Sequence, residues 1–315
     1  MASEHTFLVE LGVEELPPDA LAPLAEAFAH GIEQGLRDAD VAFMAVHAYA
    51  TPRRLAVQIE RLAERQPDRD IERLGPAVKA AFDADGNPTK AASGFASSLG
   101  IDASALMRID TDKGERIGYR YTQPGEATTA LLPEIVTHAV DALPVPKRMR
   151  WGASRIEFSR PVHWLVMLYG EDVVPACVLG LGADRVTFGH RFHHPEAITL
   201  RHADDYLSRL EEAKVLADMP RRREEILRQV QAEAARIEAT AVIDDDLLNE
   251  VTGLVEWPVA LTGRFDERFL AVPAECLISS MKANQKYFHL LDEQDNLIPA
   301  FITVSNIESR DPRQV

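Results

Sequence analysis

The sequence of 315 residues is poor in cysteine and has no long apolar run. Its two cysteines, Cys177 and Cys276, cannot form the disulfide framework of a small secreted domain, and we expect both to be buried thiols in a reducing cytoplasm. A membrane-spanning helix needs about 20 consecutive apolar residues, and the sequence contains no such run. The first residues lack the basic and apolar regions of a signal peptide. We therefore expect a cytoplasmic protein that does not span a membrane.

The sequence also lacks the short motifs that bind nucleotides or activate nucleophiles. Gly180-Leu181-Gly182 begins like a dinucleotide-binding loop, but Arg185 stands where a third glycine is required. No phosphate-binding loop, no Gly-x-Ser-x-Gly elbow and no paired Cys-x-x-Cys motif occurs. We therefore predict no catalytic residue and no cofactor in this chain.

Negative charge dominates the composition. The 34 Lys and Arg residues against 50 Asp and Glu residues give a formal net charge of −16. Such a chain repels nucleic acids and anionic membranes as a whole, so we expect no DNA binding, and any contact with RNA must come from a local basic cluster.

One basic cluster lies within residues 147–160, where Glu157 is the only acid and Trp151 and Phe158 are interleaved. Guanidinium groups bind phosphate through paired hydrogen bonds, and aromatic rings stack on bases. The alternative is that these side chains pair with carboxylates of the same chain. The predicted RNA-binding residues are Lys147, Arg148, Arg150 and Arg160, with Arg155 in the same run and a weaker pair, Lys282 and Lys286, beside Tyr287.

Histidines form the most plausible place for a metal ion. His190, His193 and His194 lie within five residues, and His163 precedes them. Neutral imidazole is a suitable zinc ligand, but in a strand His190 and His193 would point to opposite faces, and Arg191 would place a cation among the ligands. A structural role is therefore favoured and no metal is predicted. A metal-dependent hydrolase or editing module around these four histidines remains an alternative, as does a protein-interaction scaffold without RNA contact.

Two acidic clusters have simple structural interpretations. Glu14 and Glu15 follow a predicted strand, and a sharper hypothesis pairs them with Arg53 or Arg54 on neighbouring elements. Residues 244–246 are three consecutive aspartates, whose spacing does not suit a calcium loop. An N-cap and first helical turn explains them better.

Hydrophobic spacing predicts the main elements. Apolar residues recur every three or four positions over residues 19–38 and 126–143, which is typical of amphipathic helices. Residues 7–13 and 161–169 are apolar on both faces, as expected of central strands. Helices and strands do not alternate regularly, so an α+β fold with mixed or antiparallel sheets and packed helices is favoured.

The proline-rich segment near residue 145 predicts a boundary between two domains. The first is an α+β domain over residues 1–145, and the second is an α+β domain over residues 146–315. The charged, helical stretch at about 203–256 is interpreted as an insertion in the second domain.

Eight short strings stand out along the chain, among them Thr51-Pro52-Arg53-Arg54-Leu55 and Gly189-His190-Arg191-Phe192. Taken together and in order, they resemble the β subunit of bacterial heterotetrameric glycyl-tRNA synthetase. The resemblance covers essentially the whole chain. The strings occupy residues 9–18, 51–55, 147–152, 160–164, 189–192, 255–259, 284–288 and 304–307.

The resemblance implies an α₂β₂ enzyme that joins glycine to tRNA(Gly) with ATP and Mg²⁺, both bound in the class II site of the α subunit. It implies that the β subunit contributes tRNA recognition, and that its first part is similar to α+β domains in the larger subunit of phenylalanyl-tRNA synthetase. The family's β subunit continues into an HD-like domain and an anticodon-binding domain, so this chain resembles an N-terminal fragment. We expect an architectural role with the α subunit as partner, and RNA positioning by the basic cluster.

Overall fold

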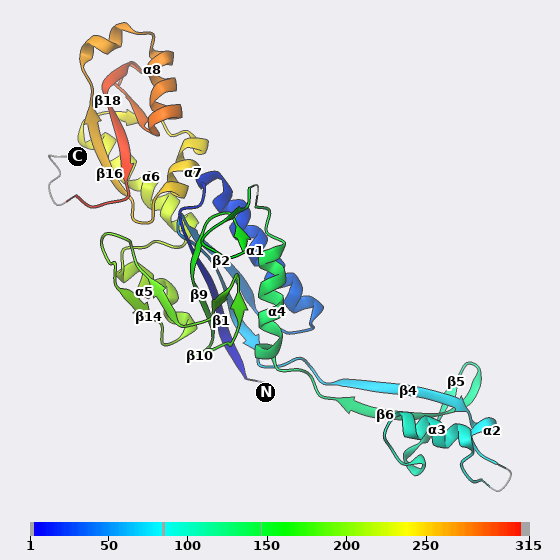
Figure 1. Cartoon of the computed structure of the whole chain (residues 1–315). Helices are drawn as coiled ribbons and strands as arrows, with labels where there is room; N and C mark the ends of the chain where they lie inside the picture. The colour runs from blue at the N-terminus through cyan, green and yellow to red at the C-terminus, as the bar shows by residue number, and fades with distance from the viewer. Residues whose placement is uncertain (1–2, 84–85, 146, 310–315) are drawn as a thin grey trace. The chain divides into compact units, whose positions relative to one another are not determined.

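The computed structural model describes residues 3–83, 86–145 and 147–309 (Figure 1). The chain divides into two compact units, one formed by residues 1–64 and 128–315 and the other by residues 65–127. This division differs from the predicted boundary after residue 145. Strand β9 (Val162–Tyr169) pairs along β1 (Glu4–Val13), so the segments on both sides of that position share one sheet.

The larger unit is built around a five-stranded antiparallel sheet with the order β10-β9-β1-β3-β2. Seven consecutive residues of β1, Phe7 to Val13, are buried because strands pair on both of its edges and other elements cover both of its faces. The prediction of a central buried strand there is confirmed. The other strands of the sheet are β2 (Ala45–Thr51), β3 (Arg54–Ala63) and β10 (Asp172–Val173).

Helices α1 (Leu21–Asp38) and α4 (Thr128–Asp141) pack together over one face of this sheet (Figure 1). The buried side of α1 carries Leu24, Phe28 and Ile32, which follow the predicted helical spacing. The opposite face is covered by residues 198–217, which include η3 (Ala203–Asp205) and α5 (Tyr206–Glu212).

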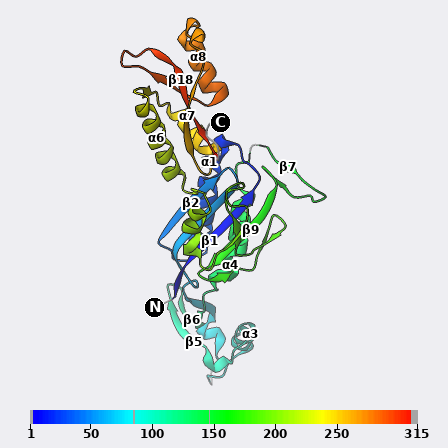
Figure 2. The same ribbon diagram turned by 90° about the vertical axis from the view of Figure 1, so that its left-hand side faces the viewer.

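A second layer of the larger unit packs α6 (Met219–Arg236) and α7 (Asp245–Leu254) against a four-stranded antiparallel sheet. Figures 1 and 2 both show these helices beside the strands. The predicted helical stretch at 203–256 is mainly helical, but α6 and α7 form one layer of a sandwich and do not stand apart. The strands are β15 (Thr240–Ala241), β16 (Val259–Arg264), β17 (Phe288–Leu291) and β18 (Leu297–Ser305), in the order β15-β17-β18-β16.

The unit of residues 65–127 has its own small sheet and core. Strand β6 (Gly114–Gln123) lies between β4 (Arg69–Ala77) and β5 (Met107–Thr111), and all pairing is antiparallel. Its short helices pack around Ala81, Ala92 and Ile117. They are α2 (Val78–Ala81), α3 (Lys90–Ser98) and η2 (Ala103–Ala105).

The remaining elements of the larger unit are short hairpins and short helices. They are η1 (Pro18–Ala20), β7 (Met149–Arg150) with β8 (Glu157–Phe158), β11 (Cys177–Val178) with β12 (Leu181–Gly182), β13 (Val186–Phe188) with β14 (Ala197–Thr199), η4 (Glu267–Ala271), α8 (Ala274–Ser280) and η5 (Met281–Gln285).

The predicted α+β class with antiparallel sheets is confirmed, whereas the prediction of two buried thiols is wrong. Cys177 lies in the hairpin β11–β12 and Cys276 in α8, and both side chains are exposed. Cys177 faces outward because successive side chains of a strand point to opposite sides, and its neighbour Val178 is the buried one, whereas α8 buries none of its residues. Within the ranges that the structure describes, no helix is long and apolar enough to span a membrane.

Candidate functional site

The topology brings three loops together at one end of the central sheet. Strand β1 runs antiparallel to both β3 and β9, so its last residue lies at the same end as the first residues of those two strands. The backbone N–H of Glu14 donates to the carbonyl of Pro161 at 2.8 Å, and that of Leu16 donates to the carbonyl of Pro52 at 2.7 Å. These bonds hold the loop after β1 against the β2–β3 turn and the start of β9.

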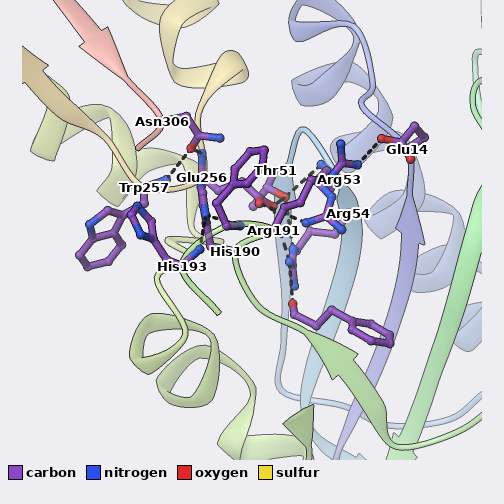
Figure 3. A network of polar contacts seen from close by, with 12 residues as sticks. Glu14, Thr51, Arg53, Arg54, His190, Arg191, His193, Glu256, Trp257 and Asn306 are labelled. Atoms are coloured by element: carbon purple, nitrogen blue, oxygen red, sulfur yellow. Dashed lines mark hydrogen bonds and ion pairs between the residues drawn. The ribbon is translucent and has the colours of Figure 1, made fainter. Parts of the chain in front are cut away.

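A fully buried arginine, Arg54, lies at the centre of this region (Figure 3). Its guanidinium donates to Glu10 Oε1 at 2.9 Å, to the carbonyl of Phe188 at 2.9 Å and to Thr51 Oγ1 at 3.2 Å. A second buried carboxylate, that of Glu256, lies 3.5 Å from it. Burial lowers the pKa of Arg54, but the two carboxylates more than offset this and raise it above the ordinary value, so the group is a buried cation.

Glu256 connects the central sheet to the segment after α7. Its carboxylate accepts a hydrogen bond of 2.6 Å from the hydroxyl of Thr51, at the end of β2. The backbone N–H groups of Glu256 and Trp257 both donate to Asn306 Oδ1, at 2.7 and 3.1 Å. The segments that carry the family resemblance at 51–55, 189–192, 255–259 and 304–307 therefore meet around one carboxylate.

A second buried arginine, Arg222 on α6, holds the same junction through backbone groups. It donates to the carbonyls of Thr252 at 3.0 Å and Ala50 at 2.9 Å, and also to the carbonyl of Leu216. Burial lowers its pKa to about 10, so the guanidinium is still charged at neutral pH. Helix α6, the last turn of α7 and strand β2 are thus joined by one side chain.

Two more arginines lie at the edge of this centre. Arg191 donates to a carboxylate oxygen of Glu14, and His163 lies 3.1 Å from the other oxygen. The hydrogen bond from Arg191, opposed by partial burial and helped by His163, lowers the pKa of Glu14. Arg53 lies 3.8 Å from Glu256 and 5.9 Å from the ring of Trp164. Burial lowers the pKa of Arg53, and the neighbouring Arg191 and Arg54 lower it further, against the effect of Glu256.

The hypothesis that Glu14 or Glu15 pairs with Arg53 or Arg54 has the wrong partners. Glu14 pairs with Arg191, while Arg53 and Arg54 face Glu256. Glu10 had no assigned role, although a charged residue inside an apolar strand was a signal for a buried ion pair. The sequence offered no comparable signal for Glu256 or Arg222.

The four histidines do not surround one point. His163 contacts Glu14, His193 Nε2 accepts from the backbone of Glu308 at 3.0 Å, and His194 lies 3.3 Å from Glu196. His190 and His193 lie in a turn and not in a strand, with ring centroids 4.7 Å apart. Among the described residues, no three His, Cys, Asp or Glu side chains form a group that could hold a metal ion, so nothing in the geometry favours the hydrolase alternative.

The predicted basic cluster lies on the hairpin β7–β8 and the residues around it. Lys147 and Arg155 are exposed and make no ion pair with any residue in the described part of the chain. Arg148 donates to the carbonyl of Asp141 at 3.1 Å, and Arg150 pairs with Glu157 at 2.5 Å. Arg160 donates to the carbonyl of Glu15 at 3.0 Å, which joins the hairpin to the loop after β1.

The weaker pair of lysines is engaged within the protein. Lys282 pairs with Asp244 at 2.5 Å, and Lys286 pairs with Glu250 at 2.8 Å. Asp244 also accepts from the backbone N–H of Leu247 at 3.0 Å, so the predicted N-cap of α7 is confirmed. These lysines fasten the segment around η5 to α7, which accounts for them without a ligand.

The buried position of His190 predicts a loss of stability in mild acid. Its Nδ1 accepts from the backbone N–H groups of Phe192 and His193, both at 3.3 Å, and burial lowers its pKa despite the nearby Glu256 and Asn306. The unfolded chain protonates near pH 6.5, so between that value and the lower folded pKa the unfolded state binds more protons and stability rises with pH. Urea unfolding at pH 5.5 and 7.5 should show this slope, and it should be smaller in His190→Gln. Burial also lowers the pKa of His289, so some pH dependence of stability should remain in the variant. If stability rose with pH equally in His190→Gln and in the unmodified protein, His190 would not be the source of the effect.

The fold and this junction define an α+β protein in which a buried arginine–carboxylate centre joins two layers. The glycyl-tRNA synthetase β subunit family model matches residues 7–315. The chain belongs to the glycyl-tRNA synthetase β subunit family.

Curated relatives agree with the family match. A glycine–tRNA ligase β subunit of Chromohalobacter salexigens is 73% identical over 309 residues, which are 98% of this chain and 45% of that relative. Glycine–tRNA ligase β subunits of Marinobacter nauticus and Hahella chejuensis are 56% and 54% identical, over 98% and 99% of this chain. The chain thus spans about 45% of the length of these relatives.

Proposed function

We propose that this chain forms part of the β subunit of a glycine–tRNA ligase, which attaches glycine to tRNA(Gly) in the cytoplasm using ATP and Mg²⁺. In this proposal the α subunit of an α₂β₂ enzyme holds ATP, Mg²⁺ and the reacting groups. The reaction then proceeds through glycyl-adenylate and transfer to the 3′ end of the tRNA. The described part of the β subunit is architectural, and its α+β layers correspond to domains of the larger phenylalanyl-tRNA synthetase subunit.

We further propose that the hairpin β7–β8 helps to position the tRNA. The observation that carries this is the exposed positive charge of Lys147 and Arg155 in a chain of net charge −16. Each is free of the carboxylates that engage Lys282 and Lys286. Because phosphate binding by Lys and Arg releases counterions, such a contact contributes affinity that falls as salt is added.

The test is steady-state glycylation by the complete enzyme with full-length α and β subunits. Replacing Lys147, Arg148, Arg150 and Arg155 together by Ala should raise KM for tRNA by about tenfold, because up to four phosphate contacts are lost. The salt dependence of KM should also weaken. Glycine-dependent ATP–pyrophosphate exchange needs no tRNA, so it should stay unchanged.

A matched control removes the same charge elsewhere on the larger unit. Four exposed arginines, each paired with a nearby glutamate, serve for this purpose: Arg37, Arg61, Arg209 and Arg236. Their replacement by Ala should leave KM for tRNA within about twofold, since exposed pairs of this kind contribute little. An unchanged KM in the first variant, or an equal rise in the control, would refute positioning by the hairpin.

A further inference from the structure

The end of the central sheet that carries the buried centre gathers four arginines. The four are Arg53, Arg54, Arg191 and Arg222, in a chain of net charge −16. The carboxylates that act on them are Glu10, Glu14, Glu15, Asp218 and Glu256. Figure 3 shows Arg53, Arg54 and Arg191 between Glu256 and Glu14. Arg54, Arg191 and Arg222 each donate a hydrogen bond to a side chain or a backbone carbonyl, and Arg53 differs from them.

Among these four arginines, Arg53 has donors that no acceptor meets. Its guanidinium makes no hydrogen bond with a residue in the described part of the chain, and its Nε and Nη1 are buried donors without an acceptor. Glu256 does not supply one, since its Oε2 lies 3.8 Å from Arg53 Nη1, beyond hydrogen-bond distance. Burial of these two donors without an acceptor is unfavourable, and the third nitrogen, Nη2, is the one that an acceptor outside the protein can reach.

An exposed aromatic residue lies on the same turn as Arg191. Phe192 follows Arg191 in the turn after Gly189, and its side chain is 66% exposed. An aromatic face that no core residue covers, next to an arginine, is the combination that binds unpaired nucleotides. Arg160 connects this end of the sheet to the basic hairpin through its hydrogen bond to the carbonyl of Glu15.

We propose that Arg53 and Arg191 bind a backbone phosphate of unpaired RNA while Phe192 stacks on an adjacent base. In the free protein, the Glu14 carboxylate occupies Arg191 in place of the phosphate. The inference rests on the proposed function, which makes RNA the partner, but it names a site separate from the hairpin β7–β8. An acidic peptide would satisfy the arginines and leave Phe192 unused, so RNA is the better match.

The test measures binding of a fluorescein-labelled single-stranded RNA tetranucleotide to the full-length β subunit by fluorescence anisotropy. Arg53→Gln and Arg191→Gln should each weaken binding about tenfold, because each removes a charged phosphate contact. Phe192→Ala should weaken it about tenfold through lost stacking. Glu14→Gln should instead strengthen binding several-fold, because it releases Arg191. A gain of affinity cannot arise from misfolding.

Two controls and a competitor complete the experiment. Arg61→Gln and Phe269→Ala alter an exposed arginine and an exposed aromatic outside the site, and both should bind like the unmodified subunit. Thermal unfolding identifies any variant that fails to fold. If Arg53→Gln fails to fold, Phe192→Ala still tests the site, because the side chain of Phe192 is exposed. Unchanged affinity in Arg191→Gln and Phe192→Ala, or displacement of the RNA by an equal concentration of oligoglutamate, would overturn the site. Glycylation by the unmodified enzyme tests the proposed function separately, because it does not depend on these variants.

Discussion

Replacement of Arg54 by Ala is expected to lower the free energy of unfolding by about 3–5 kcal/mol. The guanidinium is fully buried, and its removal leaves the buried carboxylate of Glu10 without a cation and that of Glu256 with Arg53 alone, 3.8 Å away. A buried charge that loses its partner keeps the full cost of leaving water, and this cost is what makes the effect large. Urea unfolding at pH 7, followed by circular dichroism, measures it directly.

Two further variants distinguish the cost of leaving a buried charge unpaired from the cost of breaking an ion pair. Arg61→Ala breaks an exposed pair of 2.7 Å with Glu4 on the same sheet and should cost less than about 1 kcal/mol. Arg54→Met combined with Glu10→Leu removes both charges and should recover much of the stability lost in the single variant. A cost below about 1 kcal/mol for Arg54→Ala would mean that water reaches the carboxylates and that the centre is not closed.

Replacement of Arg222 by Ala is expected to cost a similar amount, about 3–5 kcal/mol, for a different reason. No carboxylate lies within ion-pair distance in the described structure, and the side chain donates to three backbone carbonyls from α7, β2 and the segment before α6. Its loss leaves buried acceptors unpaired and opens a cavity of guanidinium size. The measurement is again urea unfolding at pH 7.

Arg223 provides a matched control from the next position of the same helix. Its side chain is 35% exposed and pairs with Asp245 at 2.6 Å, so Arg223→Ala should cost less than about 1 kcal/mol. If Arg222→Ala and Arg223→Ala were equally mild, the joint between α6, α7 and β2 would not depend on Arg222.

Much of the fold could be predicted because its larger elements follow simple periodicities. The buried strand at the start of the chain and helix α1 repeat their apolar residues at the spacing of their secondary structure. The unit of residues 65–127 was not predicted, because its core consists mainly of alanine and one isoleucine and leaves a weak pattern. Its strands β4 and β6 are also largely exposed, so they lack the alternation that reveals a half-buried sheet.

The site was predicted less well because its residues come from distant parts of the chain. Thr51 and Glu256 are separated by 205 positions and form one hydrogen bond. Arg222 is the middle of three consecutive arginines, and only the orientation of α6 determines that it is buried while Arg221 and Arg223 reach solvent. The basic cluster could be predicted because its residues are neighbours in the sequence. The partners of Glu14 could not, because they depend on how loops meet at the end of a sheet.

The way the chain enters and leaves the unit of residues 65–127 has an evolutionary consequence. The N–H of Thr128 donates to the carbonyl of Glu64 at 2.9 Å, so the residues on either side of this unit are hydrogen-bonded neighbours in the larger unit. A segment that starts and ends at adjacent points can be lengthened, shortened or exchanged without changing the path of the surrounding strands. Changes in the length of residues 65–127 during evolution would therefore leave the strands of the larger unit and its buried arginine centre in place.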